Sequence, residues 1–180
     1  RPAVSEMMKR LEAEGLVESG REITLAEKGM HLAEIVVRRH RLAECFLTDI
    51  LGLSWAEAHQ EAGKWEHVIS PTVEKAMMAR LDDPTTCPHG NPIPGSAYEA
   101  PVLIALDEVG VGNQFVVQRI PEELEFTEGM LDFLESSAIT PGSEGTVTAI
   151  SPDGTATVHI GGAAVGVGGF ASARILVTAS

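Results

Sequence analysis

Apolar residues recur at helical spacing at the start of the chain. Within residues 3–14 the apolar positions lie three or four apart, and Gly15 follows as a helix stop. The next segment, LVESGREITL at 16–25, predicts two short strands around a Ser19–Gly20 turn. A helix, a hairpin and a further helix is the order of a winged helix-turn-helix from its recognition helix onward.

Two capping boxes predict where the next two helices begin. Thr24 with Glu27 predicts a helix that starts at Leu25 and ends near residue 51, and Ser54 with Glu57 predicts a helix of about fifteen residues. In each pair a hydroxyl precedes a carboxylate by three positions, so each side chain can bond to the backbone N–H of the other. The middle of the chain is therefore expected to be helical.

A third helix is predicted from Ser70–Pro71 to about residue 83. The segment TTCPHGNPIPGSAYEAP at 85–101 contains four prolines and cannot continue a helix. It predicts a linker and a domain boundary near residue 100.

Beyond this boundary the pattern changes to short β-like runs between glycine-containing turns, with one short helix at EGMLDFLESS. The runs are VLIAL, NQFVVQRI, GTVTAI, TATVHI and ARILV. They predict a small SH3-like (FeoA-like) barrel. The glycine-rich HIGGAAVGVGGF lacks the lysine of a phosphate-binding loop, and it predicts turns in the barrel. The fold class is thus mainly α with a C-terminal β domain.

Charge is distributed unevenly along the chain, whose formal net charge is −13. Residues 1–41 carry eight Lys and Arg against seven Glu, whereas residues 42–180 carry five basic and nineteen acidic residues. Because DNA phosphates require Lys and Arg, any DNA contact is expected in the first segment. No run is long and apolar enough to span a membrane, which predicts a cytoplasmic protein with no membrane partner. Cys45 and Cys87 show no CxxC spacing and are expected to be reduced thiols.

Imidazoles and carboxylates gather on two consecutive predicted helices. They are His40 and Glu44 on the first helix, and His59, Gly63, Glu66 and His67 on the second. At about 100° per residue each set falls on one helical face. Such a set suits a divalent metal, but His and Glu four residues apart also occur on ordinary solvated helices. An adjacent apolar stripe between Trp55 and Ile69 indicates core or a dimer interface.

Several strings resemble the family of the diphtheria toxin repressor, the iron-dependent regulator and the manganese transport regulator. They are PAVSEMMKRLEAEGLV at the start, HRLAE at 40–44, TDILGL after it, AHQEAGKWEHV at 58–68 and GNPIPG at 90–95. The resemblance implies the C-terminal part of a winged helix-turn-helix domain at 1–35. It also implies metal-binding and dimerisation helices with their linker at 36–100, and the barrel at 101–180. The resemblance further implies that this sequence lacks the first part of the family's winged-helix domain.

The resemblance also implies roles for individual residues. His40, Glu44 and His59 correspond to the family's ancillary metal site, with Glu125 and Glu128 of the barrel as further candidate ligands. Glu66 and His67 correspond to the primary, regulatory site. The family places Cys or Glu where this chain has Gly63, so only the main-chain carbonyl of Gly63 remains as a ligand there. The DNA-binding candidates are Arg1, Pro2, Ala3, Ser5, Glu6 and Lys9.

The expected function is a metal-dependent transcriptional repressor of metal-ion homeostasis that binds double-stranded operator DNA as a homodimer. Carboxylate, imidazole and carbonyl ligands suit a hard cation, so Mn²⁺ is favoured over Fe²⁺, while other divalent metals are expected to bind in vitro. No enzyme is predicted. Two other functions stay open: a metal-dependent hydrolase with Glu44 or Glu66 as general base, and a metal-buffering module that does not bind DNA.

Overall fold

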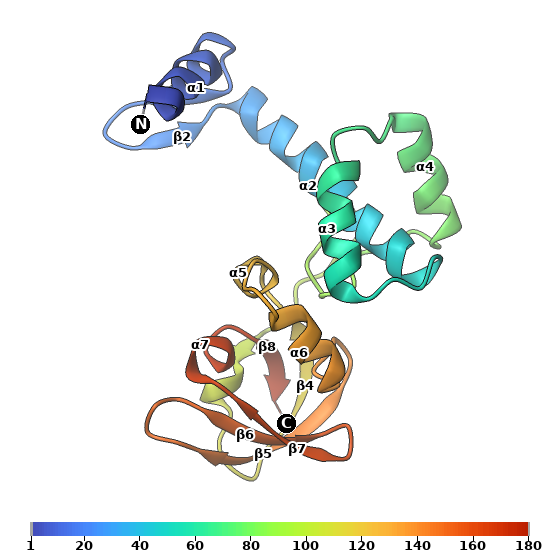
Figure 1. Ribbon diagram of the computed structural model, residues 1–180, viewed down its shortest axis with the longest axis vertical. Coiled ribbons are helices and arrows are strands. Elements are labelled where there is room, and N and C mark those ends of the chain that lie inside the picture. Colours follow the sequence, from blue (N-terminus) through green and yellow to red (C-terminus); the bar gives the residue numbers. More distant parts are fainter. Residues whose placement is uncertain (1, 180) are drawn as a thin grey trace.

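The computed structural model describes residues 2–179, arranged as a small N-terminal unit, a helical layer and a β domain (Figure 1). The N-terminal unit contains helix α1 (Pro2–Ala13) and the antiparallel strands β1 (Val17–Ser19) and β2 (Ile23–Leu25). The predicted helix and hairpin are therefore present. The turn spans residues 20–22 rather than Ser19–Gly20.

The predicted capping box of Thr24 and Glu27 is wrong. Thr24 lies in β2 opposite Glu18, so its backbone belongs to the hairpin and not to a helix start. The next helix has Ala26 as its N-cap and no side-chain cap. A hydrogen bond from the Ala26 N–H to the Leu16 carbonyl oxygen, at 3.0 Å, ties this helix start to the hairpin instead.

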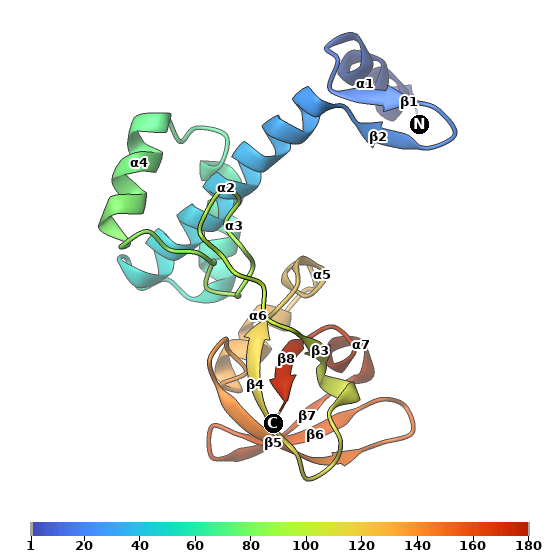
Figure 2. The same ribbon diagram turned by 180° about the vertical axis from the view of Figure 1, so that it is seen from behind.

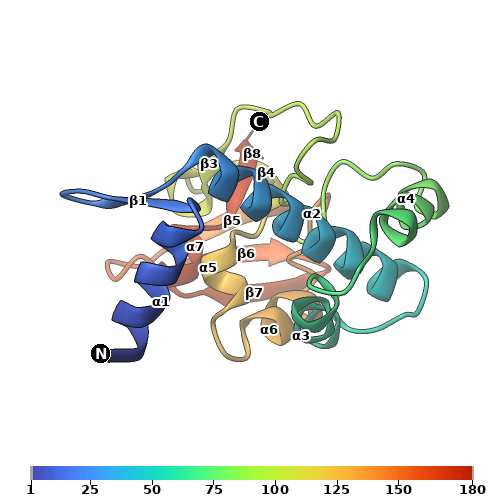
Figure 3. The same ribbon diagram turned by 90° about the horizontal axis from the view of Figure 1, so that it is seen from above.

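Three helices form the middle layer. Helix α2 (Glu27–Asp49) is long and joins the hairpin to the rest of the molecule, followed by α3 (Trp55–Trp65) and α4 (Pro71–Arg80) (Figure 3). The capping box of Ser54 and Glu57 is confirmed, since each side chain bonds to the other residue's backbone N–H. The buried apolar residues of this layer are Leu42, Ala43, Leu47, Ala58, Ala62, Ile69 and Met77.

The C-terminal domain is built on a six-stranded antiparallel sheet in the order β3-β8-β4-β5-β6-β7. Its strands are β3 (Ile104–Ala105), β4 (Gln114–Arg119), β5 (Glu144–Ile150), β6 (Ala156–Ile160), β7 (Ala163–Val167) and β8 (Leu176–Ala179). Short helices α5 (Glu122–Glu125) and α6 (Met130–Ser136) connect β4 to β5, and α7 (Gly169–Ser172) precedes β8. The predicted fold class, mainly α with a C-terminal β domain, is confirmed.

One strand was missed by the sequence pattern. The glycine-rich segment predicted as turns contains β7, which pairs with β6 along five residues. Only the turn before it, at Gly161 and Gly162, uses positive φ angles. The strand alternates small residues with valine, and small side chains give little apolar pattern to detect.

The proline-rich segment 85–101 does more than link two domains. It returns from α4 across α2 before entering the β domain (Figure 2). Its Cys87 and Ile93 are buried with Cys45 of α2, and Arg38 of α2 donates a 2.6 Å hydrogen bond to the Pro94 carbonyl oxygen. The segment is therefore packed structure that adds a third wall beside α2 and α3.

The β domain also packs directly on the helical layer. Trp55, at the start of α3, belongs to the β domain's apolar core, and its backbone N–H donates to a carboxylate oxygen of Glu135 at 3.1 Å. The Ile120 N–H donates to the His89 carbonyl oxygen at 2.8 Å. These contacts bring α5 close to α2 and α3. None of the described helices is long and apolar enough to cross a membrane.

Candidate metal centre

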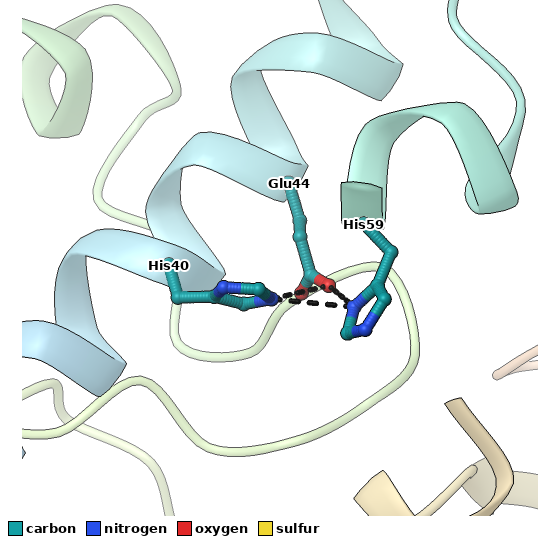
Figure 4. A group of neighbouring side chains, drawn as sticks. All are labelled: His40, Glu44 and His59. Atoms are coloured by element: carbon teal, nitrogen blue, oxygen red, sulfur yellow. Dashed lines mark hydrogen bonds and ion pairs between the residues drawn. The ribbon is translucent and has the colours of Figure 1, made fainter. Parts of the chain in front are cut away.

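Three predicted ligands meet between α2 and α3. His40 and Glu44 lie one turn apart on α2, and His59 faces them from α3 (Figure 4). Glu44 Oε1 lies 3.1 Å from His40 Nε2 and 2.9 Å from His59 Nδ1, and the two ring nitrogens are 3.3 Å apart. Ligands around an octahedral ion with bonds near 2.1 Å are about 3.0 Å apart. The donor atoms are thus already spaced for one cation.

Glu44 is the centre of this cluster. Its side chain is 1% exposed, and its Oε2 has no hydrogen-bond partner among the described residues. Burial by itself would raise the pKa of this carboxyl, but hydrogen bonds from His40, His59 and His89 outweigh burial and hold the pKa well below its ordinary value. A buried carboxylate with an unpartnered oxygen is costly unless a cation compensates it, so this site fits a metal.

His40 connects Glu44 to Glu66. Its Nδ1 lies 2.7 Å from Glu66 Oε2, while its Nε2 faces Glu44. Burial would lower the pKa of His40, but hydrogen bonds and charge from Glu44 and Glu66 outweigh burial and raise it above 6.5. Glu66 therefore approaches the same imidazole from its other side.

The other two residues predicted on this part of the chain lie outward. His67 is 66% exposed, with Nε2 3.2 Å from Glu66 Oε1. Gly63 is exposed, and a Cβ atom placed there would meet nothing within 4 Å. Gly63 and His67 are thus exposed, whereas Glu66, just after α3, faces His40.

The β domain contributes Glu125 from α5. This side chain is 3% exposed, and its Oε2 lies 3.6 Å from His59 Nδ1. Asn91 donates a 2.6 Å hydrogen bond to its Oε1 and so holds the carboxylate toward the helices. Glu128, in contrast, is exposed and lines a hollow that His59 and Glu125 also line. Only the first of the two predicted glutamates reaches the cluster.

His89 and Cys87 were missed as candidate ligands. His89 is fully buried, with Nδ1 3.2 Å from Glu125 Oε1 and 3.5 Å from Glu44 Oε1. Burial would lower its pKa, but hydrogen bonds to Cys87, Glu125 and Glu44 raise it to about 12. Both residues come from the segment predicted as a linker, and helical spacing offers no means of finding ligands in a loop. In the sequence, the only indication of a ligand pair in this loop is that Cys87 and His89 lie two positions apart in CPHG.

The predicted DNA-binding residues lie on α1. Arg1 lies outside the described residues, and Pro2 and Ala3 are described only as backbone of this helix. Ser5, Glu6 and Lys9 are all exposed. Helix α1 therefore presents polar side chains to solvent at the end of the molecule far from the metal cluster (Figure 1).

A helical layer with a cluster of His and Glu side chains, joined to a helix and a hairpin, is the combination expected of a metal-responsive DNA-binding protein. Residues 26–95 match the family described as "Iron dependent repressor, metal binding and dimerisation domain". The chain is 37% identical over 174 residues to the iron-dependent repressor IdeR of Mycobacterium tuberculosis, covering 89% of this chain and 75% of that protein. The chain belongs to this family, which includes the diphtheria toxin repressor and the manganese-dependent repressors.

Two further matches support membership of this family. The diphtheria toxin repressor of Corynebacterium diphtheriae is 46% identical over 114 residues, which are 62% of this chain and 46% of that protein. A solved structure of a manganese-dependent transcriptional repressor in complex with manganese superposes with a TM-score of 0.85 at 34% identity, covering 99% of this chain and 85% of that one. These relatives are transcriptional repressors, and both iron and manganese occur among their metals.

Proposed function

We propose that this chain is a divalent-metal-dependent repressor that binds double-stranded operator DNA as a homodimer, with Mn²⁺ favoured over Fe²⁺. The observation that carries the proposal is the cluster of His40, Glu44 and His59, whose three donor atoms lie within 3.3 Å of one another. Its imidazole and carboxylate donors suit a harder divalent ion. Glu66 and His67 are proposed as the regulatory ligands, with the Gly63 carbonyl beside them.

We assign the proposed roles to three segments of the chain. Residues 1–35 would contact DNA, residues 36–100 would bind metal and dimerise, and residues 101–180 would form the β domain that supplies Glu125. Helix α1 supports the first assignment because it exposes Ser5 and Lys9, which suit phosphate and base contacts.

Exposed apolar side chains support a dimer surface on the helical layer. Leu51 is 52% exposed, Val68 77% and Val73 48%, and all three belong to the segments around α3 and α4. Large apolar side chains left in water at the ends of neighbouring helices favour association with a second copy. The predicted stripe is different, because Trp55 and Ile69 are buried within the chain and belong to its core.

The test is DNA affinity as a function of metal. Selection from a random duplex library in the presence of Mn²⁺ first gives a binding site, and fluorescence anisotropy then measures affinity for it with and without Mn²⁺. The wild type is compared with Glu66→Ala/His67→Ala and with His40→Ala/Glu44→Ala. Lys64→Ala, an exposed change on the same helix, is the matched control.

We expect Mn²⁺ to raise the affinity of the wild type and the control by at least tenfold. The Glu66/His67 variant should lose this gain, and the His40/Glu44 variant should keep part of it, as expected of an ancillary site. A wild-type gain in the Glu66/His67 variant would place the regulatory site elsewhere. Metal binding with no effect on any selected duplex would leave metal buffering or metal-dependent hydrolysis as the function.

A further inference from the structure

A second group of metal-ligating atoms, all on buried residues, also includes Glu44. Cys87 Sγ, His89 Nδ1 and a carboxylate oxygen of Glu44 all lie within 4.8 Å of one another. All three residues are at least 96% buried. They share Glu44 with the cluster of His40 and His59, whose two imidazoles are partly exposed.

The loop that carries this group is fixed by its backbone. Cys87 and His89 flank Pro88 in a turn closed by a 2.9 Å hydrogen bond from the Gly90 N–H to the Cys87 carbonyl oxygen. Gly90 has a φ of +82°, and a Cβ atom there would lie 2.0 Å from the Gln118 carbonyl oxygen. Only glycine fits, so the turn is pressed against the β domain and its two side chains are held in place.

The spacing of the donor atoms matches a tetrahedral ion better than direct hydrogen bonds. His89 Nδ1 lies 3.5 Å from Glu44 Oε1, 3.2 Å from Glu125 Oε1 and 3.8 Å from Cys87 Sγ. Charge-assisted N–H···O bonds are usually about 2.8 Å long. Around a tetrahedral ion with ordinary zinc bond lengths, N and O ligands are about 3.3 Å apart and N and S ligands about 3.5 Å apart.

We propose that Cys87, His89 and Glu44, with Glu125 as the fourth ligand, form a second metal position that takes a borderline-soft divalent cation such as Zn²⁺, Co²⁺ or Fe²⁺. A thiolate and an imidazole select such ions over Mn²⁺. Glu44 then bridges this ion and the one held by His40 and His59. Its Oε2, unpartnered among the described residues, gains the role of a ligand.

Metal binding at this position releases protons and transfers no electrons. The Cys87 thiol and the His89 Nδ1–H each lose a proton to solvent when the metal–sulfur and metal–nitrogen bonds form, and nothing is oxidised or reduced. The buried Glu44 and Glu125 carboxylates supply the negative charge that compensates the cation. This position does not depend on DNA binding, and it uses Cys87 where the first cluster uses no sulfur.

Cobalt tests the proposal directly. Metal-free full-length protein is titrated with Co²⁺ under argon, and thiolate-to-cobalt charge transfer is followed in the near ultraviolet. The wild type is compared with Cys87→Ser, and Cys45→Ser is the matched control because Cys45 is also a buried free thiol. We expect the band in the wild type and in Cys45→Ser and its loss in Cys87→Ser.

X-ray absorption at the zinc edge gives a second readout that needs no variant. With two equivalents of Zn²⁺ the wild type should show a sulfur shell near 2.3 Å beside its N and O ligands. Absence of both the sulfur shell and the cobalt band in the wild type, or a band that follows Cys45, overturns the proposal. If Mn²⁺ still stimulates DNA binding in that case, His89 serves to orient Glu44 and Glu125, and the proposed function stands.

Discussion

Replacing Glu44 by Gln tests whether a buried charge organises the metal centre. The substitution keeps the shape of a side chain that is 1% exposed but removes the charge that faces His40, His59 and His89. Removing one partner of a buried ion pair costs about 3–5 kcal/mol. In the variant His40 still pairs with Glu66, and His89 still pairs with Glu125. We therefore expect the free energy of unfolding of the metal-free protein to fall by about 3 kcal/mol, the lower end of this range.

Metal should also stabilise the variant less. At a free metal concentration of about 100 times Kd, binding adds about 2.7 kcal/mol to the stability of the folded state. If Glu44→Gln weakens binding at this cluster a hundredfold, the same concentration adds only about 0.4 kcal/mol there. We therefore expect two effects together: a lower stability of the metal-free protein and a smaller stabilisation by added metal. Both are expected of a ligand whose charge also balances the imidazoles that face it.

The assay is urea unfolding in EDTA and in excess Mn²⁺, with Glu128→Gln as the control. Glu128 is exposed and lines the hollow that His59 and Glu125 also line. Its replacement should change neither the stability of the metal-free protein nor the stabilisation by Mn²⁺. A metal-free unfolding midpoint in Glu44→Gln equal to that of the wild type would refute the reasoning. It would mean that the carboxylate is not needed to hold the three imidazoles in place.

Three further changes test other parts of the structure. Gly63→Cys adds a thiol where a Cβ meets nothing within 4 Å, so competition titrations should show a shift in preference from Mn²⁺ toward Zn²⁺ or Co²⁺; an unchanged preference would separate Gly63 from the metal. Gly29→Ala places a Cβ 1.9 Å from the Leu16 carbonyl oxygen, and should lower stability in urea by about 1–3 kcal/mol and weaken DNA binding. Ser54→Ala removes the α3 cap and should cost about 1 kcal/mol in the same assay; a neutral result would show that packing alone fixes the start of α3.

The sequence predicts features whose cause is local. The Ser54 capping box was found because both partners lie within one helical turn, and His40 with Glu44 was found because a helix places residues four apart on one face. The Thr24 capping box failed for the opposite reason. Thr24 pairs with Glu18 across the hairpin, and that tertiary pairing outweighs a local pattern that is otherwise identical.

Features that depend on distant segments were not predictable in this way. His89 and Glu44 are 45 positions apart, and only the packing of the proline-rich loop against both α2 and the β domain brings them together. The loop was predicted as a linker because its prolines exclude a helix, which is correct, but composition says nothing of what a loop packs against. Burial of His89 and Cys87 follows from that packing alone.

Under the proposed function, helix α2 explains how a cation in this centre would act on the distant N-terminal segment. It has 23 residues and is therefore about 35 Å long, and the hairpin lies at its first turn (Figure 3). His40 and Glu44 lie in its second half. Candidate ligands from α2, α3 and the β domain lie around one centre, so a bound cation would fix the direction of α2 relative to the other two. The close approach of Gly29 to Leu16 ties the start of α2 to the segment between α1 and β1. In the proposed dimer the two copies of α1 would have to match half-sites about 34 Å apart, and any cation that favoured this spacing would be bound more tightly, by the same factor, when DNA is present.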